Sequence, residues 1–222
     1  TLKAQGTLSG SPTITSIVEG RKVWTPAGER FTRNPAWIVW DLLTNTRYGV
    51  GLPASHLSLE SFTAAAAYCD ELVDGEPRFT LDYIIDSQRP AIDVLRDMLS
   101  CCRGYILARE KVELHIDRPV ASAYKVLTPD NFVEGTFSWW QKSASDTPNR
   151  IVIEWVDPSG HYERSSAPFD WAEDIQRRGI IERKFSLLGL TDAAQVGRMG
   201  AYLLETARGV VIRGRGAADD KG

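Results

Sequence analysis

The chain has 222 residues, of which 43% are hydrophobic and 25% charged, and its formal net charge is -3. This composition is typical of a globular protein with one large or two small domains, and it excludes a disordered chain. The slight acidity argues against a general basic surface for nucleic acid, and no apolar run approaches the roughly 18–20 residues of a membrane-spanning helix. The chain begins at Thr1 without a signal-peptide pattern, so we expect it to be a piece of a longer protein.

Residues 1–30 are the first region of the chain. Within it, residues 21–25 (RKVWT) are predicted to form a strand, because Val, Trp and Thr favour strands. We expect this strand to pair with the C-terminal half. Such pairing would make the intervening segment an insertion into a β domain built from both ends of the chain.

Two helices are predicted early in the segment 31–118. Asn34-Pro35 is a helix start, since Asn accepts a hydrogen bond from the first turn and Pro has no N–H to leave unpaired there. The residues that follow, 36–43, are apolar except Asp41, so this helix should be buried on most sides. Ser58 is the predicted cap of a second helix that runs to about Leu72.

A strand, a third helix and a hairpin complete this segment. Residues 79–85 alternate as a strand does, and Pro90 opens a helix. Residues 105–108 and 112–116 are predicted to form a hairpin. The third helix has a predicted buried stripe made of Ile92, Leu95, Met98, Leu99 and Cys102. The segment 31–118 is therefore predicted to be an inserted α+β subdomain with a helix-strand-helix-hairpin order.

The segment 119–222 has a different character. Prolines recur at about ten-residue intervals between strand-like runs at 137–142, 151–156 and 180–187. One helix is predicted at about 191–207, with Thr191 as its cap. The fold class expected for the whole chain is α+β, with a β-rich domain resembling a barrel or sandwich in this half.

Cysteines and histidines give no catalytic or metal-binding pattern. The three cysteines, of which two are adjacent, have neither a disulfide framework nor CxxC spacing, and buried thiols are expected. His56, His115 and His161 are scattered, with no HxH or HExxH spacing. The sequence therefore predicts no enzyme, no catalytic residue, no metal ligand and no cofactor.

Several aromatic and charged residues are candidates for an interface. Adjacent strand residues point to opposite faces, so one of Trp139 and Trp140 should face outward, toward a protein partner or a sugar. Asp170, Glu173 and Asp174 lie near Trp171, as acids do in glycosidases, although a solvated acidic turn also explains them. The predicted interface residues are Trp139, Trp140, Trp171, Arg177 and Arg178.

Residues 34–51 (NPAWIVWDLLTNTRYGVG) resemble the signature NPA…DLLTN.RYG.G of the phage tail tip proteins, the host specificity protein J family. Weaker similarities follow in the family's order along the chain. They lie at residues 18–24, 66–70, 90–117 and 179–195. On this resemblance the chain is identified as a central fragment of such a protein.

The resemblance implies a structural role. Members form the hub that closes the distal end of the tail tube, which resembles a baseplate hub and is typically trimeric. The implied partners are other tail tip and tail tube proteins, further copies in a homotrimer and the remainder of the parent chain. The implied location is the tail tip of a phage or prophage virion, after assembly in the host cytoplasm. The alternative is a carbohydrate-binding or cell-wall-degrading tail module that uses Trp139 or Trp140 with the nearby acids.

Overall fold

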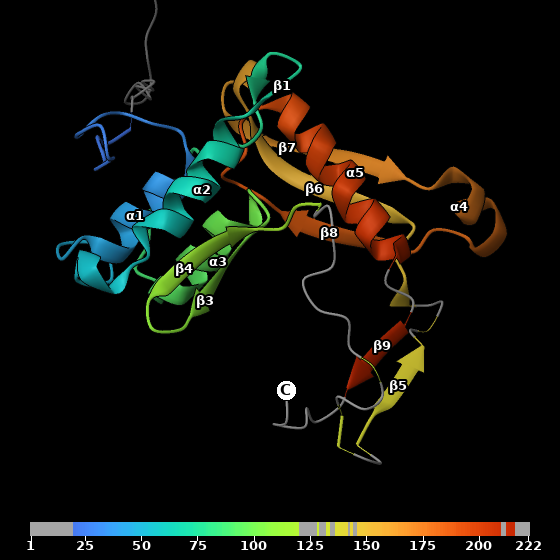
Figure 1. Cartoon of the computed structure of the whole chain (residues 1–222). Helices are drawn as coiled ribbons and strands as arrows, with labels where there is room; N and C mark the ends of the chain where they lie inside the picture. Colours follow the sequence, from blue (N-terminus) through green and yellow to red (C-terminus); the bar gives the residue numbers. More distant parts are fainter. Residues whose placement is uncertain are drawn as a thin grey trace, which may run out of the picture.

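The structure is a computed structural model that describes residues 20–119, 128, 132–133, 136–141, 143, 146–209 and 212–215. Its helices and strands make an α+β fold, as the sequence predicts (Figure 1). A helical unit contains three helices and a hairpin. A sheet unit contains three strands with a long helix lying across them, and a two-stranded ribbon lies beside it (Figure 1).

The first two helices begin where the sequence places them. Helix α1 spans Pro35–Thr44, and the Asn34 side chain accepts a hydrogen bond from the Ala36 amide at 3.0 Å. The same side chain donates to the Ala66 carbonyl at 2.9 Å. Ala66 lies in helix α2, Leu59–Asp70, which Ser58 caps. Asn34 therefore both starts α1 and ties it to α2.

The rest of the helical unit matches the prediction except at three points. Helix α3 spans Ala91–Ser100, and strands β3 (Gly104–Ala108) and β4 (Val112–Ile116) form the expected hairpin. Ile92, however, is 52% exposed, so it lies outside the buried stripe. Residues 79–85 are not a strand of a sheet, because their amides bond to irregular segments: Leu81 to Arg33 O and Asp82 to Gly189 O. A small hairpin, β1 (Leu72–Val73) with β2 (Glu76–Pro77), precedes them.

The three-stranded sheet has the order β7-β6-β8. Its central strand β6 (Arg150–Asp157) pairs antiparallel with β7 (Glu163–Asp170) and parallel with β8 (Glu182–Ser186). Alternate side chains of β6 are buried, namely Ile151, Ile153 and Trp155. The sequence does not predict β7, because Pro168 interrupts its strand pattern. In the structure Pro168 lies opposite Val152 on an edge strand, where a missing N–H is tolerated.

Two helices complete the sheet unit. Helix α4 spans Ala172–Arg178 and fills the connection between β7 and β8. Helix α5 spans Ala193–Gly209 and crosses the sheet (Figure 1). Its cap is Asp192, whose carboxylate accepts from the Ala194 amide at 2.9 Å, and not Thr191 as predicted. Thr191 instead hydrogen-bonds to Asp82, which holds its hydroxyl away from the helix.

The N-terminal strand region makes only local pairing in its described part. Val23 pairs antiparallel with Arg30 across a tight turn. The strand predicted at residues 21–25 is thus reduced to this single bridge. Residues 1–19 lie outside the described residues, and the pairing of 1–30 with the C-terminal half stays a prediction. In the C-terminal half, β5 (Ser138–Gln141) pairs with β9 (Ile212–Arg215). A barrel or sandwich built from these strands also stays a prediction.

Close packing of α5 on the sheet depends on Gly200. A Cβ atom at Gly200 would lie 2.3 Å from ring carbons of Phe169 on β7, whereas Gly197, one turn earlier, has no heavy atom within 4 Å of such a Cβ. We expect Gly200→Ala to lower the free energy of unfolding by about 1–3 kcal/mol through overpacking. The matched Gly197→Ala should raise it by about 0.5–1 kcal/mol, since alanine favours helix. Urea unfolding of both variants checks this pair, and equal effects would contradict the packing.

Candidate functional site

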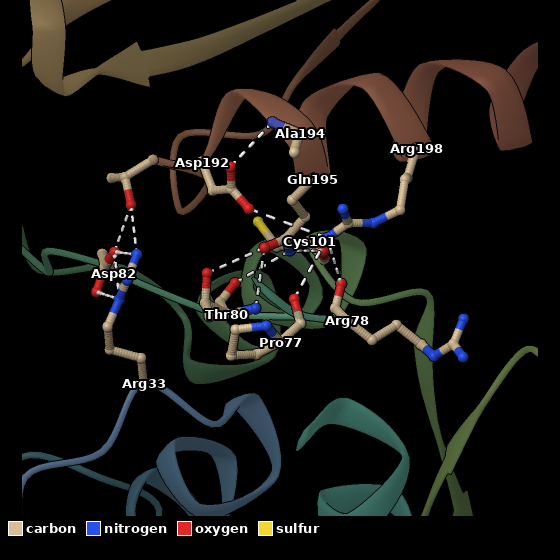
Figure 2. Close-up of polar contacts among 11 residues, drawn as sticks. Arg33, Pro77, Arg78, Thr80, Asp82, Cys101, Asp192, Ala194, Gln195 and Arg198 are labelled. Carbon is tan, nitrogen blue, oxygen red and sulfur yellow. Dashed lines mark hydrogen bonds and ion pairs between the residues drawn. The ribbon is translucent and has the colours of Figure 1, made fainter. Parts of the chain in front are cut away.

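A buried glutamine joins the helical unit to α5 (Figure 2). Gln195 is fully buried, and its Oε1 accepts from the Thr80 amide at 2.9 Å and the Thr80 hydroxyl at 3.0 Å. Its Nε2 donates to the Thr80 carbonyl at 3.1 Å and the Cys101 carbonyl at 3.2 Å. One side chain thus satisfies backbone groups of two segments in the helical unit. We call this contact region the junction.

Two arginines extend the junction on either side of Gln195 (Figure 2). Arg33 forms a two-pronged ion pair with Asp82, with its Nε 3.0 Å from Oδ1, and also donates to the Thr191 hydroxyl at 2.9 Å. Arg198 donates to the carbonyls of Pro77 and Arg78 at 3.3 and 3.1 Å. The junction therefore combines a buried amide with partly exposed charged contacts that fix the angle of α5.

Gln195 is the last residue of the 179–195 similarity, but no contact is predicted for it from the sequence, although one signal is present. Gln195 lies four residues before Met199, on the same stripe of α5 that buries Val196 and Gly200. A polar residue within a buried helical stripe needs hydrogen-bond partners, and this need points to a contact with another segment. The partners themselves are more than ninety residues away in sequence and could not be named.

Within residues 34–51 the helical part packs inward, whereas Tyr48 and Val50 in the loop that follows are exposed. Pro35, Ala36, Trp37, Val39, Trp40, Leu42 and Leu43 are all buried. The loop after α1 folds back on the helix: the Val50 amide donates to Leu42 O and the Tyr48 hydroxyl donates to Asp41. A Cβ at Gly49 would lie 2.1 Å from Leu42 O, so only glycine fits there. The motif is therefore a folding element of the helical unit.

An aromatic cluster lies beside this motif. The ring of Trp40 stacks on Trp24, with centroids 5.3 Å apart, and meets Phe62 edge-on at 5.0 Å. Trp37 and Trp40 are buried as predicted, while Trp24 is 40% exposed. A shallow pocket of about 450 Å³ lies next to Trp24 and is lined by Trp24, Trp40, Thr44, Ala54 and Leu59.

The predicted interface tryptophans differ in how far the structure describes them. Trp139 and Trp140 lie on β5 opposite Gly214 and Arg213 of β9, and their side chains lie outside the described part of the chain. Trp171 is partly buried, and the Arg208 guanidinium from the end of α5 lies 4.3 Å above its ring. One face of Trp171 is thus used within the chain, and the interface role of all three tryptophans stays a prediction.

The predicted acidic and basic residues around α4 form an internal network. Asn149 is fully buried; its Nδ2 donates to Asp174 at 3.0 Å, and its Oδ1 accepts from the Ile181 amide at 2.7 Å. Asp174 in turn is ion-paired with Arg178. Arg177 and Glu173 are exposed. Arg178 is therefore a structural partner of Asp174, while the interface role predicted for it and for Arg177 stays a prediction.

The carboxylates near Trp171 are held as anions. Hydrogen bonds from Arg150 keep the pKa of Asp170 below its ordinary value, with the nearest pair at 2.6 Å. The Arg178 guanidinium does the same for the pKa of Asp174, with Asn149 adding to it. A glycosidase needs one carboxyl whose pKa is raised so that it can donate a proton. Asp170 and Asp174 lack this property, which disfavours the wall-degrading alternative at these acids.

The lowered pKa of Asp174 predicts an acid-dependent contribution to stability. A carboxylate stabilised in the folded state contributes above the unfolded pKa of about 3.9 and loses that contribution as pH falls through the lower folded value. We expect Asp174→Asn to be less stable than the parent chain at pH 7, with a difference that shrinks below about pH 4. Urea midpoints at several pH values test this. Glu173→Gln is the control, and a difference independent of pH would contradict it.

The thiols are structural in the folded chain. Cys69, Cys101 and Cys102 are free and buried, and burial raises the pKa of all three. Within the part of the chain that the structure describes, no group of three or more His, Cys, Asp or Glu side chains is arranged to hold a metal ion. No helix among the described residues is long and apolar enough to cross a membrane.

Comparison with known proteins assigns the chain to a family. Residues 90–210 match the family described as "Putative phage tail protein". The chain belongs to this phage tail protein family. The matched residues run from α3 to the end of α5, so they include the β3–β4 hairpin, the three-stranded sheet and Gln195.

Two curated relatives extend the match toward the N-terminus. Tip attachment protein J of Escherichia phage SECphi27 is 28% identical over 184 residues, which are 79% of this chain and 15% of that protein. Tip attachment protein J of Escherichia phage SECphi4 is 27% identical over 179 residues, 77% of this chain and 16% of that protein. The chain thus spans about 15–16% of the length of these relatives. The resemblance to phage tail tip proteins is confirmed, and the chain is a phage tail component.

Proposed function

We propose that this chain is hub scaffold of a phage or prophage tail tip, closing the distal end of the tail tube and supporting host recognition and attachment. One observation carries the proposal: most of the chain aligns with a small share of two long tip attachment proteins. A short share of a long attachment protein suits a supporting segment. The proposed location is the virion tail tip, after assembly in the host cytoplasm.

The proposed role is structural and not catalytic. The motif of residues 34–51 is used for packing and turns, and the acids Asp170 and Asp174 are neutralised by arginines. Both features support a scaffold that has to be rigid. The proposed partners are the remainder of the parent chain, other tail tip and tail tube proteins, and two further copies in a homotrimer.

We also propose that residues 31–118 are an insertion into a β-rich domain formed by 1–30 and 119–222. Contacts at both ends of this segment support the proposal. Arg33, near its start, donates to the Thr191 hydroxyl just before α5. Asp117, near its end, accepts from the Tyr202 hydroxyl on α5. Both ends of the segment 31–118 thus contact α5 or Thr191 just before it, as expected for a unit inserted into another domain.

Gold labelling of intact particles tests the proposed location. Antibodies raised against the 222-residue chain should label only the tail end remote from the capsid in negatively stained particles. Labelling after pre-incubation of the antibody with the free chain is the control and should disappear. Label along the tail shaft, on the capsid or only on fibres would contradict the proposal.

A mass measurement tests the proposed homotrimer. Mass photometry of the full-length parent protein should show a species of three times the chain mass. The same measurement on a variant with the junction disrupted, Gln195→Leu, shows whether assembly depends on the folded unit. A full-length parent protein that stays monomeric at all accessible concentrations would contradict the trimer.

A further inference from the structure

Four arginines and three aromatic rings gather across the junction. The Arg78 and Arg118 guanidiniums lie 4.5 and 5.2 Å from the ring centre of Tyr68. The Arg103 guanidinium lies 4.8 Å from the ring of Phe79 and 4.5 Å from that of Tyr202. We call this set the arginine–aromatic surface; its members are Tyr68, Arg78, Phe79, Arg103, Arg118, Arg198 and Tyr202.

The surface is built from segments of both units. Tyr68 comes from α2, Arg103 follows α3, and Arg118 follows β4. Tyr202 comes from α5, one turn after Arg198, which donates to the carbonyls of Pro77 and Arg78. Stacking on rings fixes the planes of these guanidiniums before any partner arrives, which lowers the entropy cost of binding.

The arginines of this surface are unequally neutralised. Arg78 is ion-paired with Glu71 at 2.8 Å, and Arg198 lies 3.9 Å from Asp192. Among the described residues, no carboxylate lies within 4.0 Å of the Arg103 or Arg118 guanidinium. Asp117, which directly precedes Arg118, accepts a hydrogen bond from the Tyr202 hydroxyl instead. Arg103 and Arg118 are thus oriented cations without an anionic partner in the described part of the chain.

Unsatisfied donors gather at the same place. In the part of the chain that the structure describes, the buried side-chain nitrogen and oxygen atoms without a hydrogen-bond partner are Nε of Arg78, Arg103 and Arg198. All three belong to the arginine–aromatic surface. Because these Nε atoms are buried, a docking partner would have to contact the outer Nη atoms of the same guanidiniums.

We propose that the arginine–aromatic surface docks an acidic segment of a neighbouring tail protein, with Asp or Glu carboxylates received by Arg103 and Arg118. This inference rests on the proposed function, because it needs a neighbour in the tail. The planar guanidinium of arginine can bind a carboxylate through two parallel hydrogen bonds. Arginine and tyrosine are also enriched at protein interfaces. A carboxylate partner is favoured over nucleic acid because the neighbours proposed for the chain in the tail are proteins.

Binding of a fluorescent hexaglutamate peptide to the 222-residue chain tests the proposal, measured by anisotropy at physiological salt. We expect saturable binding that the double change Arg103→Gln with Arg118→Gln weakens about tenfold. Arg118→Gln alone should weaken it about threefold; Arg118 is exposed, so this variant keeps the fold. The control Arg164→Gln removes an exposed arginine on β7 and should change binding less than about twofold.

Three outcomes would overturn the proposal: no saturable binding, an equal loss in Arg164→Gln, or tighter binding of a single-stranded oligonucleotide than of the peptide. A hexaglutamine peptide should not bind, because it lacks carboxylates. The test is independent of the proposed location. Gold labelling of particles decides the place of the chain in the tail whether or not the peptide binds.

Discussion

Replacement of Gln195 by leucine is expected to lower the free energy of unfolding by about 3–5 kcal/mol. Leucine has nearly the volume of glutamine but offers no hydrogen bonds. The change leaves the Thr80 amide, the Thr80 carbonyl and the Cys101 carbonyl unpaired in a site with no solvent exposure. Each unpaired buried group costs about 1–3 kcal/mol, so three of them account for the loss.

Equilibrium urea unfolding measures this effect, with Gln176→Leu as the matched control. Gln176 lies on the exposed side of α4, so its replacement should change stability by no more than about 0.5 kcal/mol. Thr80→Val should reproduce part of the loss, since it removes the hydroxyl that bonds to Gln195 at 3.0 Å. A Gln195→Leu chain as stable as the control would mean that the junction does not depend on this amide.

Replacement of Trp40 by alanine should lower the free energy of unfolding by about 3–5 kcal/mol. Trp40 is 5% exposed and contacts three other aromatic rings, so its removal leaves a large cavity. Edge-on and stacked ring pairs add to the loss beyond the buried area. The cavity lies in the middle of the 34–51 motif, where backbone contacts limit collapse.

Trp24→Ala is the control for Trp40→Ala, and thermal unfolding compares the two. Trp24 packs on the same cluster but is 40% exposed, so its removal should cost less than half as much. An equal loss of stability from both variants would contradict the assignment of Trp40 to the buried core of the cluster.

Local signals in the sequence predicted much of the helical unit. Asn34 and Ser58 cap helices through hydrogen bonds to amides two or three residues away, and such contacts depend only on neighbouring residues. The β3–β4 hairpin was predicted for the same reason, since its turn joins adjacent strands. The α+β class and the phage tail tip family followed from patterns and motifs within single segments.

Long-range contacts explain what the sequence did not predict. Polar and apolar residues alternate only weakly along β7, so its sequence does not look like a strand. Pro168 is tolerated there because β7 pairs with β6 on one side only and is therefore an edge strand. Thr191 fits a helix cap locally, yet Asp82, more than one hundred residues away, takes its hydroxyl. The acids near Trp171 resemble a sugar-cleaving pair in the sequence, but in the structure Arg150 and Arg178 form ion pairs with Asp170 and Asp174.

Electron cryo-microscopy of the intact particle tests the central claim most directly. The account predicts that the fold of residues 20–118 and 146–209, with α5 across the β7-β6-β8 sheet, fits density at the distal end of the tail tube in three symmetry-related copies. The arginine–aromatic surface of each copy should lie against density from a neighbouring chain. Density for this fold elsewhere in the particle, or at the tip without threefold symmetry, would contradict the account.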